Sequence, residues 1–163
     1  MVVFVWKLLN LGCDLISITY GIRKAKEIEL SPYTQLVYGL IVTYLGGILR
    51  DCVILRTMPS ILSAFEDMVF IIVWAVVLIL FENPKELYKG VSQSNGMPNS
   101  IHIFVCFVSM ITGHIQGILA SKPIYLCIIC GILTAFTGEI IAQSDMIQKY
   151  NYIIRDFVNK KSQ

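Results

Sequence analysis

Ionisable residues inside long apolar stretches are the strongest candidates for chemistry in this sequence. Lys7, Asn10 and Asp14 interrupt an apolar run, and their spacing of three and four residues places them on one face of a helix. Such a polar stripe faces protein or water rather than lipid. We expect Lys7 and Asp14 to pair with each other or with a partner subunit. Glu139 lies in another apolar run. It could be a cation or proton site, or it could be an acid that is paired internally or lies near the interface.

Three further groups admit both a functional and a structural interpretation. Arg50 and Asp51 follow an apolar run, where they could line or gate a pore, or form an interfacial charge pair, which contributes about 0–1 kcal/mol if it is exposed. Cys127 and Cys130 form a C-x-x-C sequence, but no second pair accompanies it and its surroundings are apolar, which favours packing over metal or redox chemistry. His114 is interpreted as a hydrogen-bonded packing residue.

The sequence contains none of the usual catalytic patterns. No Ser/His/Asp set, phosphate-binding glycine loop or metal-spaced His/Glu cluster occurs in it. We therefore expect no enzymatic activity, no catalytic residues, no cofactor and no metal site.

The composition indicates that the elements carrying these residues have lipid as their solvent. Of the 163 residues, 56% are hydrophobic and 15% are charged, with a mean hydropathy of +0.70. Soluble domains are about 45–50% apolar and about 25% charged. The net charge of +2 is small, and no basic face interleaved with aromatic residues is present, so nucleic acid is not an expected partner.

Hydropathy predicts an all-α membrane protein with five to six transmembrane helices. The five clear spans are residues 2–20, 34–49, 61–81, 101–119 and 124–142. Residues 21–33 form a basic loop, residues 50–60 a short connection, and Ser31-Pro32 opens the second span. Nine basic residues fall on one side of these spans and three on the other, which places the first side in the cytoplasm or its equivalent, such as the mitochondrial matrix.

An internal repeat organises these spans. A shift of 92 residues without gaps superimposes Gly21 on Gly113, Gly39 on Gly131, and Gly46 on Gly138. The repeat predicts four regions: a first three-helix unit (1–81), a linker (82–100), a truncated second unit (101–143) and an amphipathic C-terminal helix or tail (144–163). Because each unit has an odd number of spans, the second enters the membrane inverted.

Residues 39–51 end in Gly46-Gly47-Ile48-Leu49-Arg50-Asp51 and resemble the signature of the trimeric intracellular cation (TRIC) channel family. The closer similarity is to its bacterial branch, with a glycine-transporter-like domain, here degenerate and truncated at its C-terminus. The resemblance implies a seven-helix fold, trimers, and a pore in each subunit for monovalent cations such as potassium. On that basis Gly46, Gly47, Arg50 and Asp51 are pore elements of the first unit, with Gly138 opposite them. Glu139, next to Gly138, is added to these pore candidates because it is an acid within an apolar run.

Two functions follow, and both place the chain in a lipid bilayer. The first is a TRIC-type homotrimeric channel for monovalent cations. The second is a non-conducting structural subunit of a larger membrane complex, such as a respiratory-chain assembly of the mitochondrial inner membrane. The second is favoured by residues Glu139, Ala142 and Gln143, which stand where the family has glycine, arginine and aspartate.

Overall fold

The computed structural model describes residues 2–59, 65–81 and 99–143, and all regular structure in these ranges is helical. The prediction of an all-α chain is confirmed for them. The predicted tail, residues 144–163, and most of the linker lie outside the described residues. The elements are α1 (Val2–Glu27), α2 (Pro32–Leu49), a π-helical segment η1 (Arg50–Leu55), α4 (Phe65–Phe81), α6 (Asn99–Leu119) and α7 (Ile124–Gln143).

The first helix is longer than predicted, because residues 21–27 continue α1 instead of forming a loop. Packing against the rest of the chain explains the difference. Gly21 is buried, and a β-carbon there would lie 2.9 Å from the Cα of Gly39 in α2, so this part of α1 is in close contact with its neighbour. Lys26 Nζ also donates a hydrogen bond to the carbonyl of Leu78 in α4, at 2.6 Å. The helix ends at Glu27, and Glu29 adopts a left-handed conformation with φ of 55°.

The second helix begins as predicted and extends further than predicted. Ser31 caps it by accepting a hydrogen bond from the backbone N–H of Thr34, and Pro32 occupies the first turn, where its missing N–H leaves no bond unmade. Residues 50–55, predicted as a connection, continue it as η1. The segment closes at Arg56, which has a φ of 56°.

One helical segment in the described residues is long and apolar enough to cross a membrane by itself. This is Pro32–Leu55, with 24 residues and a mean hydropathy of 1.5. The apolar parts of α6 and α7 are shorter, Ile103–Leu119 and Ile124–Gly138. The five α-helices of the described residues thus correspond to the five predicted spans. Within these residues, only the segment formed by α2 and η1 meets the length and composition required to cross a membrane.

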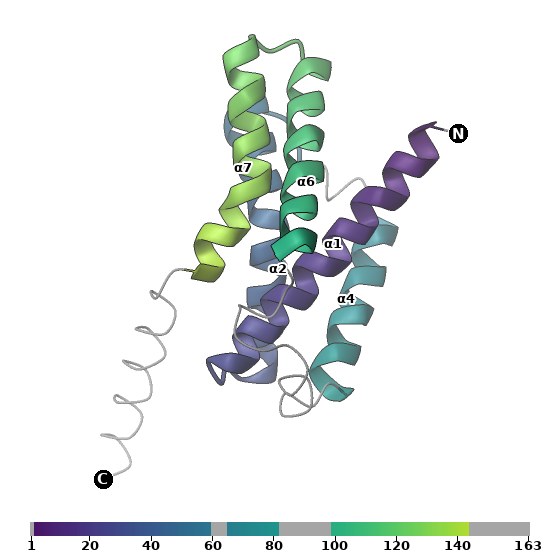
Figure 1. The fold of residues 1–163 in the computed structure, drawn as a ribbon, viewed down its shortest axis with the longest axis vertical. Coiled ribbons are helices and arrows are strands. Elements are labelled where there is room, and N and C mark those ends of the chain that lie inside the picture. The colour runs from purple at the N-terminus through teal and green to yellow at the C-terminus, as the bar shows by residue number, and fades with distance from the viewer. Residues whose placement is uncertain (1, 60–64, 82–98, 144–163) are drawn as a thin grey trace.

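The helices alternate in direction along the chain and form two close pairs, α1 with α2 and α6 with α7 (Figure 1). The pairs meet mainly where α2 packs against α7. A β-carbon at Gly46 would collide with the backbone carbonyl of Leu133, and one at Gly138 with that of Val42. Both positions therefore require glycine if α2 and α7 are to cross at this distance.

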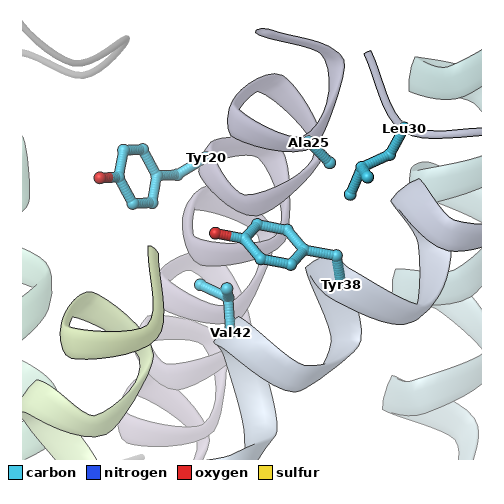
Figure 2. Packing of buried hydrophobic residues seen from close by; sticks show 5 residues of the cluster. All are labelled: Tyr20, Ala25, Leu30, Tyr38 and Val42. Carbon is cyan, nitrogen blue, oxygen red and sulfur yellow. The ribbon is translucent and has the colours of Figure 1, made fainter. Parts of the chain in front are cut away.

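Buried apolar side chains hold each pair together. Between the end of α1 and the start of α2 lies one cluster, to which α1 contributes Tyr20 and Ala25, the connection contributes Leu30, and α2 contributes Tyr38 and Val42 (Figure 2). On the other side of this pair, α4 runs parallel to α1. Its Ile71 and Ala75 are fully buried with Ile18 and Ile22 of α1.

Candidate functional site

A cavity of about 480 Å³ lies between the helices, and all six described elements contribute to its wall. On α1 the wall carries the predicted polar stripe, Lys7, Asn10 and Asp14, which continues to Ser17. Asn10 donates a hydrogen bond to the carbonyl of Trp6 at 2.8 Å and accepts one from the hydroxyl of Thr112 in α6, also at 2.8 Å. The stripe therefore lines the cavity, with Lys7 at an exposed position, in agreement with the prediction that it faces protein or water.

The opposite wall is built where α2 changes into η1. Arg50 and Asp51 are 4% and 3% exposed, and Arg50 Nε lies 2.6 Å from Asp51 Oδ1. Arg50 also donates from Nη1 to the hydroxyl of Thr134 in α7 at 3.3 Å, and that hydroxyl donates to the carbonyl of Cys130 at 2.8 Å. Adjacent side chains diverge on a regular α-helix, and the contact between Arg50 and Asp51 coincides with the change to π-helical geometry, which recurs at functional sites.

The remaining wall consists mainly of small polar groups. On α6 these are Ser109, Thr112 and Gln116, whose spacing of three and four residues places them on one helical face. On α7, Gly138 adds backbone to the wall, and on α4 Asp67 adds a carboxylate. The cavity is thus polar on several sides, although the surrounding helices are mostly apolar.

The charges in the cavity wall do not balance. Lys7 and Arg50 contribute two positive charges, and Asp14, Asp51 and Asp67 contribute three negative charges. Lys7 pairs with Asp67 at 3.5 Å and Arg50 pairs with Asp51, whereas Asp14 has no ion-pair or hydrogen-bond partner among the residues that the structure describes. The described wall therefore carries one uncompensated negative charge when every carboxylate is ionised.

The structure brings most of the predicted site residues to this cavity. Gly47, Arg50, Asp51 and Gly138 line it, whereas Gly46 lies at the α2–α7 crossing instead. Glu139 belongs to α7, but its side chain lies outside the described part of the structure.

The expected pairing of Lys7 with Asp14 is wrong. Lys7 pairs with Asp67 of α4, because α4 lies beside α1. Arg50 and Asp51 form a pair that is buried, so the small contribution expected of an exposed pair does not apply to it.

Sequence reasoning missed the polar contribution of α6 and α7. Ser109, Thr112, Gln116 and Thr134 were not recognised as wall residues, although the spacing of the first three contained a usable signal. Small polar residues are common in packed membrane helices, so spacing alone is a weak indication. Cys127 is buried where α7 meets α6, with its backbone against Gly117.

Comparison with known proteins gives one family. Residues 11–83 match the family model described as "Glycine transporter", a domain found in TRIC-like proteins. No curated protein matches the chain. The matched region covers a little under half of the sequence and contains most of α1, all of α2 and η1, and α4. The first three-helix part of this chain, which supplies Asp14, Arg50 and Asp51 to the cavity, is therefore similar to a membrane transporter domain.

Proposed function

We propose that this chain is a multi-pass membrane protein whose central cavity conducts small monovalent cations. The observation that carries the proposal is the polar cavity of about 480 Å³, with three carboxylic acids and two basic side chains in its described wall, inside a bundle of apolar helices. Polar and ionisable groups within a membrane characteristically face a protein interior or an aqueous path. Acidic side chains in such a path favour cations over anions.

The outer surface supports insertion into a membrane. Large apolar side chains are exposed along each of the five helices, for example Phe4 on α1, Ile41 on α2, Phe70 on α4, Phe104 on α6 and Ile129 on α7. In water such a surface would associate with other apolar surfaces. In a bilayer the same side chains contact lipid, and the alternating helix directions allow each helix to cross in turn (Figure 1).

Repeated contacts support the arrangement as two inverted units. A β-carbon at Gly39 would contact Ile18, and one at Gly131 would contact Met110; both members of the second contact lie 92 residues after those of the first. In the same way, Gly21 lies against Val42 and Gly113 lies against Thr134. The two helix pairs thus share a contact pattern.

Contacts between the units support their inversion. Gly46 lies near Thr134, whereas Val42, four residues earlier on α2, lies near Gly138, four residues later on α7. Moving along the contact in one direction, the residue numbers of α2 increase while those of α7 decrease, so the two helices are antiparallel. Equivalent helices in opposite directions are the hallmark of transporters and channels built from inverted repeats.

The test is potassium flux into liposomes containing the purified protein. We expect flux above that of empty vesicles, and we expect Asp14→Asn to reduce it because this change removes the uncompensated charge in the wall. Glu66→Gln is the matched control, since Glu66 is an exposed acid in the first turn of α4 that does not line the cavity. Absence of flux from protein that remains helical and monodisperse would refute conduction. Uptake of glycine without potassium flux would instead assign the cavity to the cargo named by the matching family.

A non-conducting structural role is the second candidate. The observation that favours it is that no described helix packs against α6 and α7 in the way that α4 packs against α1 and α2. On this proposal the chain is a lipid-embedded subunit of a larger assembly, such as a mitochondrial inner-membrane complex, and has no catalytic role. Migration in mild detergent only as a small homo-oligomer, including the trimer expected of a TRIC-type channel, would contradict it.

A further inference from the structure

The central cavity lies where the two helix pairs meet, and its wall repeats the relation between them. Residues 92 positions apart line it together, on α1 with α6 and on α2 with α7. Three such pairs are Asp14 and Cys106, Ser17 and Ser109, and Val42 and Thr134. In membrane proteins built from inverted repeats, ion and substrate sites lie at the interface of the repeats, near the middle of the membrane. The part of the cavity between equivalent residues is therefore the first place to look for a binding site.

The helices α1 and α6 cross beside this part of the cavity, in opposite directions (Figure 1). Thr112 of α6 donates a hydrogen bond to Asn10 of α1 at 2.8 Å. Cys13, one turn further along α1, packs with Val108, one turn earlier on α6. Asp14 follows Cys13 directly in the sequence and lines the cavity, so its carboxylate belongs to this crossing.

Three polar side chains at the crossing have no hydrogen-bond or ion-pair partner in the part of the chain that the structure describes. They are Asp14 and Ser17 on α1 and Ser109 on α6. A hydroxyl inside a helix often donates to the carbonyl four residues earlier, as those of Thr19 and Thr137 do here. The two serines make no such bond, so their oxygens remain available to a ligand in the cavity.

The carboxylate of Asp14 determines the class of that ligand. The other two carboxylates of the described wall are paired with its two basic side chains. An unpaired ionised carboxylate in an apolar bundle is costly, and a bound cation removes this cost. One carboxylate balances one monovalent cation, whereas protein sites for Ca²⁺ typically gather several. Neutral oxygens such as hydroxyls can replace part of the hydration shell of the ion without adding charge.

We propose that Asp14, Ser17 and Ser109 bind one partly dehydrated alkali-metal cation in the middle of the cavity. This inference rests on the proposed function, because it concerns the ion of the same path, and it adds that the ion is held at a defined site. The two serines are equivalent residues of the two units, and they contact the ion from opposite helices. The carboxylate comes from the first unit alone, since Cys106 stands at the equivalent position of the second.

Thermal unfolding of the purified full chain in detergent measures this binding without flux. Potassium chloride replaces choline chloride at constant ionic strength, so the two samples differ only in the cation. A ligand that binds only the folded protein raises its Tm, and at ten times the dissociation constant we expect a rise of about 3–6 °C. The same Tm in both salts at every concentration would overturn the proposal.

Single substitutions locate the site. Asp14→Asn should abolish the rise in Tm, while its Tm in choline chloride should equal or exceed that of the unchanged protein, because an unpaired charge is removed. Ser17→Ala and Ser109→Ala should each raise the fitted dissociation constant by similar factors, about three- to tenfold. Thr137→Val is the matched control, since the Thr137 hydroxyl lies outside the cavity wall and is bonded to the Leu133 carbonyl. An undiminished potassium response in folded Asp14→Asn, or an equal loss in Thr137→Val, would contradict the site.

The relation between the two units also supplies a rescue. Combining Asp14→Asn with Cys106→Asp moves the carboxylate to the equivalent position on α6 and should restore the potassium response. Failure of the folded double variant to respond would overturn the placement of the ion between equivalent residues. Potassium flux without any potassium-dependent rise in Tm would refute the site and leave conduction standing. A rise in Tm that depends on Asp14, without flux, would support the site and refute conduction.

Discussion

Replacing Gly46 by alanine should disrupt the crossing of α2 and α7, because no space exists there for a methyl group. The new β-carbon would overlap the carbonyl oxygen of Leu133 and would lie 3.1 Å from that of Thr134. Both obstacles are backbone atoms, which cannot rotate away as a side chain can. Relief requires the helices to separate by about 1 Å, and overpacking of this kind typically costs about 1–3 kcal/mol.

The neighbouring glycine provides a matched control for this prediction. A β-carbon at Gly47 would have one neighbour within 4 Å, the Arg50 side chain at an ordinary contact distance of 3.9 Å. Both substitutions gain about the same intrinsic helix propensity, roughly 1 kcal/mol. We therefore expect Gly47→Ala to be neutral or slightly stabilising, and Gly46→Ala to be the less stable of the two.

Thermal unfolding of both variants in the same detergent measures the difference. For a chain of this size, each kcal/mol corresponds to a shift of about 2–4 °C in Tm. Equal Tm values for Gly46→Ala and Gly47→Ala would refute the close approach of α2 and α7 at Gly46. That result would also weaken the antiparallel crossing on which the inverted arrangement depends.

Two further predictions concern polar contacts in the cavity wall. Arg50→Ala should destabilise the protein by about 3–5 kcal/mol, because it removes one partner of a buried ion pair. Lys7→Ala should change the stability by about 0–1 kcal/mol, since the Lys7 side chain is 62% exposed. Equal effects of the two substitutions in denaturant titrations would contradict the burial of Arg50. The hydrogen bond between Thr112 and Asn10 should show a coupling energy of about 0.5–1.5 kcal/mol in a double-mutant cycle of Thr112→Val and Asn10→Ala. Additive effects would show that α1 and α6 do not interact through this bond.

The sequence by itself determined the features that depend on local pattern. Apolar runs of helical length located the five α-helices that the structure describes. Ser31-Pro32 marked the start of α2, because capping and the missing proline N–H act within a single turn. The spacing of Lys7, Asn10 and Asp14 determined that they share one helical face, which the structure places along the cavity. The shift of 92 residues identified the glycines that later proved to occupy corresponding contacts.

The tertiary structure alone decided which residues meet. The partner of Lys7 is Asp67, on a helix far along the chain, and no local spacing relates the two. Residues 21–27 carry four charged side chains, but they are helical because Ile22 and Ala25 among them are buried against the rest of the bundle. Arg50 is buried because Thr134 reaches it from α7 and η1 directs it inward. Hydropathy reports only how each segment interacts with its solvent. A cavity exists only between segments, so its wall residues can be identified only from the packed arrangement of all the helices.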